Sequence, residues 1–204
     1  FRSGLGHEGS LGIAKSFIEK AKINGADAIK FQMHIPEFES SSLENFRKKF
    51  SSQDKTRYDY WKRTSFTLKE WNILKKYSIK KKIIFLCSPF SIESVDYLIK
   101  LNLDAWKIAS GEINNFLMLD HIIKKSNKPI ILSTGLSDEK EIKKTLHFIK
   151  SKLYKKKLKN ELSLLQCNSQ YPTHVSKVGH KIIQTLKKKF KLITGLSDHS
   201  GNIN

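Results

Sequence analysis

The feature of this sequence that most restricts its fold is the alternation of short apolar runs with amphipathic segments. The apolar runs are β-prone and nearly continuous, which is typical of parallel strands buried on both faces. They cover residues 26–32, 82–90, 104–112, 129–135, 162–167 and 191–199. Helices are expected between them, after the caps Ser10 and Thr67 and near 91–101, 116–126, 138–151 and 179–189. The alternation predicts consecutive βαβ units.

Two α/β architectures fit this order, an open doubly wound sheet and a closed (β/α)₈ barrel. The sequence contains no P-loop, and its one G-x-G-x-x-G stretch, "GLGHEG" at residues 4–9, precedes the first clear apolar run instead of following it, so the nucleotide-binding open sheet lacks its strongest support. Polar residues instead recur where the predicted strands end, as in the active sites of barrel enzymes. They are Lys30, Gln32, Ser88, Lys107, Ser110, Glu112, Ser133, Thr134, Ser169, Tyr171, Ser197, Asp198 and His199. We therefore expect a barrel of the TIM type.

The strand count indicates an incomplete barrel. Six runs are clear, the stretch "FRSG" at residues 1–4 fits the stub of a further strand, and the sequence stops before an eighth. We expect residues 1–204 to form a single, truncated TIM-barrel domain with about seven strands. Residues 35–66 show no periodicity but contain many aromatic residues, namely Phe38, Phe46, Phe50, Tyr58, Tyr60, Trp61 and Phe66. This stretch either packs over the strand ends or is an ordinary folded insertion.

The stretch "DAIKFQMH" at residues 27–34 places a lysine near the end of an apolar run. Alternate residues of a strand share a face, so Lys30, Gln32 and His34 should point the same way. An inward-pointing ammonium group is costly unless it has a partner, and an anionic ligand would supply one. The alternative is a lysine whose stem packs on apolar surface while its amine reaches water.

The formal charge of +19 is of a kind found in nucleic-acid-binding proteins. The excess is mostly lysine, in runs such as "LKKKFK", with little arginine for base contacts. We therefore expect solvated helix faces and no nucleic-acid partner. No apolar run is long enough to cross a bilayer and the start does not resemble a signal peptide, which favours a cytoplasmic protein without a membrane partner. Cys87 and Cys167 lack metal-type spacing and are expected to be reduced, part-buried thiols.

Six motifs carry a resemblance to a known family. They are "GHEGSLGIAKSFIEKAKINGADAIKFQ", "SPF", "WKIASGEINNFLML", "KPIILSTGLS", "LLQCNSQYPT" and "GLSDHSG". In order and spacing, over essentially the whole chain, they resemble the N-acetylneuraminate (sialic acid) synthase family. The chain is similar to the catalytic barrel of a nonulosonic acid synthase, which condenses phosphoenolpyruvate with an N-acylated aminosugar aldehyde such as N-acetylmannosamine. These motifs do not distinguish a sialic from a legionaminic acid synthase, while "SGE" argues against the pseudaminic branch.

The resemblance implies a role for each strand-end residue. Lys30 and Lys107 match lysines that bind phosphoenolpyruvate, whose phosphate and carboxylate call for cations and hydroxyl donors. The hydroxyl donors to these oxygens would be Ser88, Ser110, Ser133, Ser169 and Ser197. Gln32 and Tyr171 match positions that face the sugar, although a Tyr before Pro172 can also be a turn anchor. Glu112 matches a carboxylate lining the site and would manage protons, or it caps the next helix instead.

The resemblance also implies a divalent metal, with Mn²⁺ expected and Mg²⁺ as the alternative. The metal would be bound by His199 and would polarise the aldehyde oxygen of the sugar. The second histidine of the family's metal site belongs to the next strand, beyond Asn204. Asp198 is expected to orient the ring of His199 as a hydrogen-bond acceptor. Together with Lys107 and Glu112, His199 completes the catalytic residues that the resemblance implies.

The sequence departs from the family pattern at its start, where Arg2 stands at a Glu position and Gly6 at an Asn position. That Glu helps to bind the sugar in the family, so sugar binding is in question here. The chain also lacks the family's C-terminal antifreeze-like domain, which completes the site of a partner in a homodimer. We therefore expect a homodimer for a full-length protein and weak or no activity for the 204 residues alone.

Three other functions remain open on the sequence. A Schiff-base aldolase would use Lys30 or Lys107 as its nucleophile. A related phosphoenolpyruvate-dependent synthase would act on a phosphorylated sugar. A noncatalytic remnant would bind a carbohydrate or a nucleic acid without turning anything over.

Overall fold

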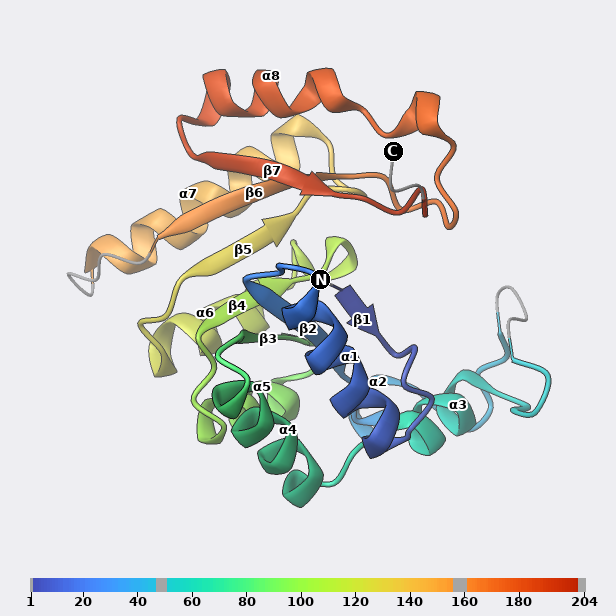
Figure 1. Cartoon of the computed structure of the whole chain (residues 1–204). Helices are drawn as coiled ribbons and strands as arrows, with labels where there is room; N and C mark the ends of the chain where they lie inside the picture. The colour runs from blue at the N-terminus through green and yellow to red at the C-terminus, as the bar shows by residue number, and fades with distance from the viewer. Residues whose placement is uncertain (1, 47–50, 156–160, 202–204) are drawn as a thin grey trace. The chain divides into compact units, whose positions relative to one another are not determined.

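The computed structural model describes residues 2–46, 51–155 and 161–201 (Figure 1). Its contacts divide the chain into two compact units, residues 1–104 and residues 105–204, and each is described by itself. Phe50, one of the aromatic residues noted above, lies outside the described residues. Each unit contains parallel strands that alternate with helices, as the sequence predicts. The expectation that all 204 residues form a single domain stays a prediction.

The first unit contains three parallel strands, β1 (Arg2–Gly4), β2 (Ala28–Met33) and β3 (Ile84–Pro89), paired in that order. Three main helices follow these strands: α1 (Leu11–Ile23), α4 (Leu68–Lys80) and α5 (Ile92–Lys100). Each helix begins after a capping hydroxyl, from Ser10, Thr67 and Ser91 respectively, that accepts a backbone N–H of the first turn. Phe31, Phe85 and Trp71 form the aromatic centre of the core.

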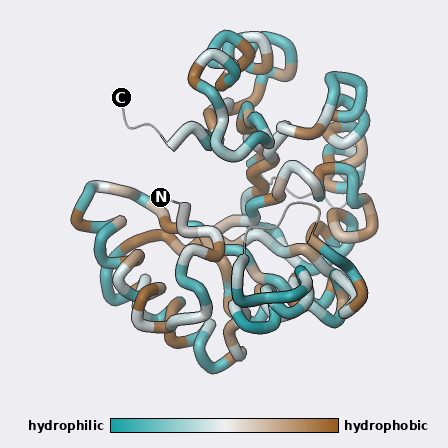
Figure 2. Tube along the Cα trace, turned by 90° about the vertical axis from the view of Figure 1, so that its right-hand side faces the viewer, coloured by the Kyte–Doolittle hydropathy of each residue, from teal (hydrophilic) through white to brown (hydrophobic). Residues whose placement is uncertain are grey.

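The second unit contains four parallel strands, β4 (Ala105–Ile108), β5 (Ile130–Ser133), β6 (Leu162–Cys167) and β7 (Ile193–Ser197), again paired in sequence order. Its helices are α6 (Phe116–Lys125), α7 (Glu139–Lys155) and α8 (His180–Phe190), with two short 3₁₀ turns, η1 (Ser110–Glu112) and η2 (Val175–Lys177). Figure 1 shows α8 lying along β6 and β7. Hydrophilic and hydrophobic stretches alternate along the helices (Figure 2), as amphipathic helices require.

The structure confirms the predicted order of strands and helices. "FRSG" does contain a strand, β1, so the described residues hold seven strands, as expected. The prediction of a strand over 104–112 is wrong at its end, because β4 stops at Ile108 and Ser110–Glu112 form the 3₁₀ turn η1. Helix α7 is longer than predicted and reaches Lys155. Its apolar stripe, with Ile149 and Leu153 buried, continues past residue 151.

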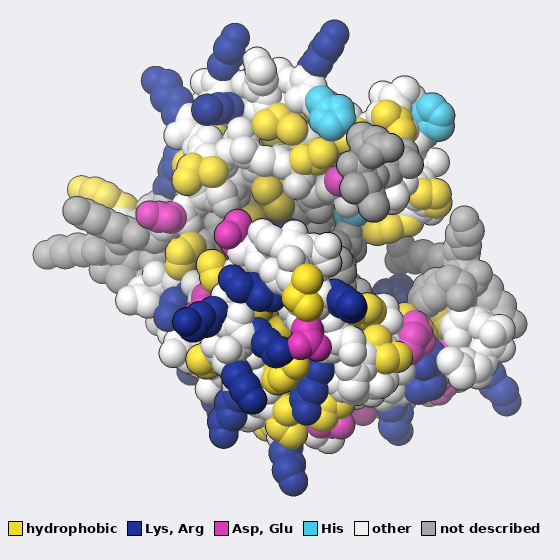
Figure 3. Space-filling model, viewed as in Figure 1, with side chains coloured by type: hydrophobic (Ala, Val, Ile, Leu, Met, Phe, Trp, Pro, Cys, Tyr) yellow, Lys and Arg dark blue, Asp and Glu magenta, His cyan; other side chains and the backbone are white. Residues whose placement is uncertain are grey.

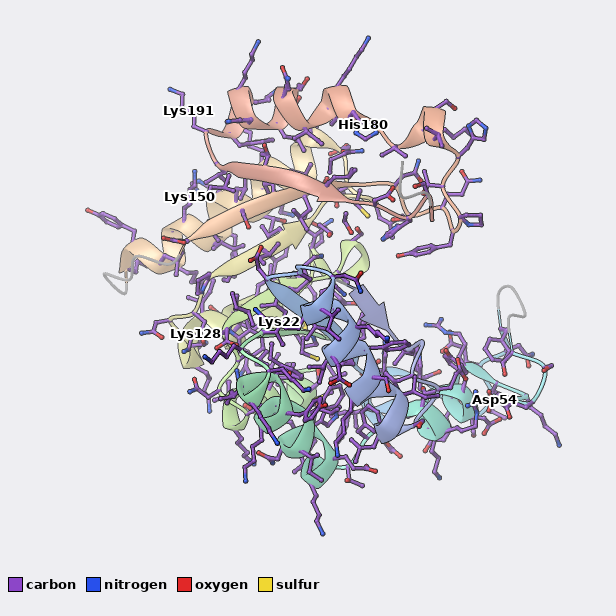
Figure 4. All side chains as sticks on the ribbon, in the orientation of Figure 1. Lys22, Asp54, Lys128, Lys150, His180 and Lys191 are labelled. Atoms are coloured by element: carbon purple, nitrogen blue, oxygen red, sulfur yellow. The ribbon has the colours of Figure 1, made fainter. Side chains whose placement is uncertain are left out.

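The excess of lysine lies largely on solvated surface. Lysine and arginine side chains are scattered over the face shown in Figure 3, with acidic side chains among them. Lys22, Lys150 and Lys191, labelled in Figure 4, are all exposed. This distribution matches the expectation of solvated helix faces. Within the described residues, no helix is both long and apolar enough to span a membrane.

The stretch 35–66 has more regular structure than the sequence indicated. It contains the short helix α2 (Pro36–Glu39) and the helix α3 (Arg57–Thr64), so its lack of periodicity did not mean a lack of helices. Helix α3 begins with a reciprocal capping box of Thr56 and Asp59, a local signal that fits its start. Arg63 joins this insertion to the turn after β1 by pairing with Glu8 at 2.9 Å and with Asp54 at 2.8 Å (Asp54 is labelled in Figure 4).

Candidate active site

In the first unit, Lys30, Gln32 and Ser88 lie on one face of two paired strands. Along β2 the side chains alternate between half-buried and buried, with Lys30 and Gln32 on the half-buried face, as predicted. His34 was expected on the same face, but it lies beyond the end of β2, where the alternation stops, and is buried. Gln32 pairs in register with Ser88 on β3, whose side chain is almost fully buried. A Cβ on Gly4 of β1 would lie 3.2 Å from Oε1 of Gln32, so β1 also borders this group. The structure therefore brings these three predicted residues together.

The charge of Lys30 reaches the buried thiol of Cys87. Burial raises the pKa of Cys87 to about 12, and the positive charge of Lys30 opposes this shift. Cys87 is thus a protonated, unreactive thiol, as expected for a buried cysteine.

In the second unit, the amine of Lys107 lies in the interior at the ends of β4 and β5. Lys107 is 5% exposed, and its Nζ donates to the carbonyl oxygen of Ile108 at 3.1 Å and to Oγ of Ser133. Ser133 is also buried. A buried cation with a hydroxyl group beside it is suited to bind a phosphate or a carboxylate.

Ser110, Ser169 and Cys167 gather around the backbone of Gly135. The N–H of Gly135 donates to Oγ of Ser110 at 3.1 Å. A Cβ on Gly135 would lie 2.7 Å from Oγ of Ser169 and 3.0 Å from both Oγ of Ser110 and Sγ of Cys167. The three side chains can approach each other this closely because residue 135 is a glycine. Two predicted phosphate or carboxylate donors are therefore neighbours.

His199 lies against Tyr171 and Ser197. Its Nδ1 is 2.6 Å from the carbonyl oxygen of Asn168, which can only accept, so Nδ1 is the donor in this hydrogen bond. Nε2 is 3.0 Å from the hydroxyl group of Tyr171 and 3.5 Å from that of Ser197. The rings of Tyr171 and His199 are stacked with centroids 4.1 Å apart.

The predicted orienting role of Asp198 is wrong. Its carboxylate accepts from the backbone N–H and the hydroxyl group of Ser200, and these bonds lower its pKa. The ring of His199 is oriented by the backbone of Asn168 instead.

Among the predicted site residues, His199 is held in a way that suits a metal ligand. A metal-binding imidazole uses one nitrogen for the metal and donates the other N–H to a carbonyl or carboxylate, which is how His199 is held. Among the residues that the structure describes, no three His, Cys, Asp or Glu side chains are placed to hold a metal ion together. His199 therefore supplies a single suitable ligand.

Glu112 is tied to the start of α6. Its carboxylate accepts from Nδ2 of Asn115 at 2.9 Å, and Asn115 in turn caps α6 through the backbone N–H of Met118. Glu112 is half-buried and stands two residues after Ser110 on η1. Its catalytic role stays a prediction.

Sequence reasoning missed Gly135 and Asn168. Gly135 carries no side chain and Asn168 acts through its carbonyl oxygen, so neither contributes a recognisable functional group to the sequence. The motif "STG" that contains Gly135 was noticed as a strand end, and a glycine directly after two hydroxyl residues was the signal available.

The chain matches the NeuB family over residues 17–204. It is 36% identical over 98% of its length to N,N'-diacetyllegionaminic acid synthase of Campylobacter jejuni, and 37% identical over 95% to pseudaminic acid synthase of the same organism. It covers 60% and 56% of these proteins, so the chain spans little more than half the length of the curated relatives it matches. These near-equal identities do not separate the legionaminic from the pseudaminic branch.

The fold is shared with a solved relative. The crystal structure of N-acetylneuraminic acid (sialic acid) synthetase from Leptospira borgpetersenii, in complex with citrate, matches with a TM-score of 0.82 and 31% identity. The match covers all of this chain and 65% of that one. It confirms the α/β class and the TIM-barrel-like order expected from the sequence, with seven strands in the described residues. On both grounds, the chain belongs to the NeuB family.

Proposed function

We propose that this chain is the catalytic part of a nonulosonic acid synthase that condenses phosphoenolpyruvate with an N-acylated aminosugar aldehyde. The observation that carries the proposal is the buried amine of Lys107 bonded to Ser133 in a member of the NeuB family. Lys30 and Ser88, two other residues predicted to bind anions, lie on the paired strands β2 and β3 of the first unit.

The reaction would begin with attack of the phosphoenolpyruvate methylene carbon on the aldehyde carbon of the sugar. A carbon–carbon bond forms, the aldehyde oxygen becomes a hydroxyl group, and positive charge develops at C2. Water adds to C2 and gives one proton to the new alkoxide. The C2–O bond to phosphate then breaks while the C2 hydroxyl group becomes a keto group, so inorganic phosphate leaves and takes the second proton. Lys107 and Ser133 would hold the anion throughout and stabilise the departing charge.

The other groups would orient the two substrates. Ser110 and Ser169 would donate to phosphate or carboxylate oxygens, while Gln32 and Tyr171 would contact the sugar. Glu112 would accept or donate the proton of the water or of the new hydroxyl group. A divalent ion, Mn²⁺ in the first instance, would be bound by Nε2 of His199 and would supply Lewis acidity at the aldehyde oxygen. A cytoplasmic location and a homodimeric full-length protein belong to the same proposal.

Binding and turnover test this proposal separately. Calorimetric titration of the 204-residue chain with phosphoenolpyruvate should show saturable binding, and the affinity of the Lys107→Met variant should be lower by at least about 10-fold. Release of phosphate would then be measured with N-acetylmannosamine and Mn²⁺. Loss of the Mn²⁺ electron paramagnetic resonance signal on binding should be weaker for His199→Gln than for the wild type. Absence of phosphoenolpyruvate binding by the wild-type chain would end the proposal.

The lysine environment also separates this reaction from that of a Schiff-base aldolase. Nζ of Lys107 donates two hydrogen bonds, whereas a nucleophilic amine needs its lone pair directed at the substrate. Borohydride reduction in the presence of pyruvate should leave the mass of the protein unchanged. A trapped adduct on Lys107 would favour the aldolase instead.

A further inference from the structure

A column of stacked planar groups joins the carboxyl ends of β2 and β3 in the first unit. His34, the first residue after β2, stacks on Trp61 with ring centroids 4.6 Å apart and an interplanar angle of 7°. Its other face stacks on Phe90, the first residue after β3, at 4.1 Å and 21°. The guanidinium group of Arg57 covers Trp61 at 4.5 Å. The aromatic column therefore runs from α3 of the insertion, through β2, to β3.

His34 is held in this column by a buried carboxylate. Its Nδ1 lies 2.6 Å from Oε2 of Glu39, and the two side chains are only 7% and 4% exposed. The other oxygen of Glu39 accepts the backbone N–H of Ile35 at 2.8 Å. The carbonyl oxygen of His34 accepts from the hydroxyl group of Ser65 at 3.0 Å. The ring and the carbonyl oxygen of His34 and the backbone N–H of Ile35 therefore all form hydrogen bonds at the end of β2.

Stability alone does not explain a histidine here. Burying a hydrogen-bonded His–Glu pair costs desolvation energy, and an apolar side chain of similar size would pack in the stack without that cost. What the pair adds is direction, because the bond to Glu39 sets the orientation of the ring while Glu39 also holds the next backbone N–H. The arrangement favours one geometry of this strand end over others.

The column lies where the backbone pairing of β2 and β3 ends. The last residue pair between β2 and β3 is Met33 with Pro89, and proline has no N–H to contribute to the ladder. The stack of His34 on Phe90 lies directly beyond this pair. Gln32 and Ser88, the preceding pair, carry the side chains assigned to the substrates.

We propose that His34 is a positioning residue, which acts through its stack with Phe90 and its bond to Glu39 to fix the spacing of Gln32 and Ser88. This inference rests on the proposed function in one respect, namely that Gln32 and Ser88 contact the substrates. His34 itself need not touch either substrate.

The strand β3 offers a matched pair of variants. Phe90→Leu, directly after β3, removes one end of the column, and Phe85→Leu makes the same chemical change near the start of β3. Phe85 is fully buried and stacks on Phe31, whereas Phe90 is half-buried. Phe85→Leu should therefore lower the melting temperature more. If the column positions the site, Phe90→Leu should nevertheless be the variant that weakens phosphoenolpyruvate binding, by about tenfold.

His34→Ala should behave as Phe90→Leu does. Amide hydrogen exchange in peptides covering residues 30–35 and 86–91 should become roughly tenfold faster in both variants. In Phe85→Leu, exchange in the same peptides should increase only as much as its global loss of stability accounts for. His34→Phe, which keeps the stack but cannot donate to Glu39, shows whether the bond is needed in addition to the stack.

The two measurements separate failure of this inference from failure of the proposed function. If the wild-type chain does not bind phosphoenolpyruvate, the proposed function fails, and hydrogen exchange alone decides whether the column positions the strand ends. If the wild type binds but His34→Ala and Phe90→Leu follow Phe85→Leu in exchange and in affinity, then the column is ordinary core packing and the inference is wrong.

Discussion

The cluster around Gly135 gives the most direct test of the proposed anion site. In Gly135→Ala, the new Cβ would lie 2.7 Å from Oγ of Ser169 and 3.0 Å from Oγ of Ser110. The backbone of Gly135 is not in the left-handed region, so alanine meets no backbone strain. The crowding falls on these two hydroxyl groups and on the thiol of Cys167, which are side-chain atoms that can move by rotation about χ1. We therefore expect the fold to survive and the site to be displaced.

The size of the effect follows from these distances. An ordinary contact begins at 3.4 Å, so Oγ of Ser169 must move by about 0.7 Å. Displacements of about 1 Å in a binding site cost on the order of 100-fold, so phosphoenolpyruvate affinity should fall by roughly 10- to 100-fold. Crowding should cost about 1–3 kcal/mol of stability, partly offset by the lower entropy of the unfolded alanine chain, about 0.4–1 kcal/mol.

Titration calorimetry and thermal melting measure the two effects separately. Gly111→Ala is the matched control, because a Cβ there would meet nothing within 4 Å in the neighbouring turn η1. We expect it to bind phosphoenolpyruvate within about twofold of the wild type. If Gly135→Ala also bound within that range, then the hydroxyl groups around Gly135 would not be contacting the ligand, and their assignment would be wrong.

Three further predictions address charge, acid sensitivity and strain. Lys107→Met keeps the length of the side chain but removes its buried charge, so phosphoenolpyruvate affinity should fall by at least about 10-fold in calorimetry, since a hydrogen bond to a charged group contributes about 1.5–3 kcal/mol. His7 is fully buried and stacked on Phe66, and this burial lowers its pKa to about 4. The unfolded chain therefore binds this proton below about pH 6.5 while the folded chain does not, so urea titrations at pH 7.5 and pH 5 should show about 2 kcal/mol more acid destabilisation for the wild type than for His7→Phe. Gly9→Ala places a Cβ 2.5 Å from the backbone oxygen of Arg63 at a φ of +80°, and neither strain can be relieved by a rotamer change. Its melting temperature should fall by several degrees, about the effect of 1–3 kcal/mol in a chain of this size.

Each of these expectations has a clear contrary result. Unchanged affinity in Lys107→Met would remove Lys107 from the site. Equal acid sensitivity of the wild type and His7→Phe would show that His7 can be protonated in the folded protein. If Gly9→Ala had the same melting temperature as the wild type, the insertion around Arg63 would not be packed firmly on the turn after β1.

Much of the fold was predictable because its signals are local. Continuous apolar runs identified β2, β3, β5, β6 and β7, and capping residues such as Ser10 and Thr67 marked helix starts within a residue. The end of β4 was not predictable in this way, because "KIASGE" continues the apolar pattern while the chain turns into η1. Helix α3 was missed because it is short and mostly polar on the surface, and its capping box was the one local mark.

The sequence by itself determined the order of βα units, the polar residues that follow the strands, and the family to which the chain belongs. These depend on periodicity and motif spacing, which are properties of neighbouring residues. Only the tertiary structure decided that His199 is oriented by the carbonyl oxygen of Asn168 and not by the adjacent Asp198, and that Gly135 makes room for Ser110 and Ser169. It also decided that His34 stacks between Trp61 and Phe90. These partners lie roughly 25 to 60 residues apart along the chain, and their contacts arise from packing geometry, which no local pattern in the sequence records.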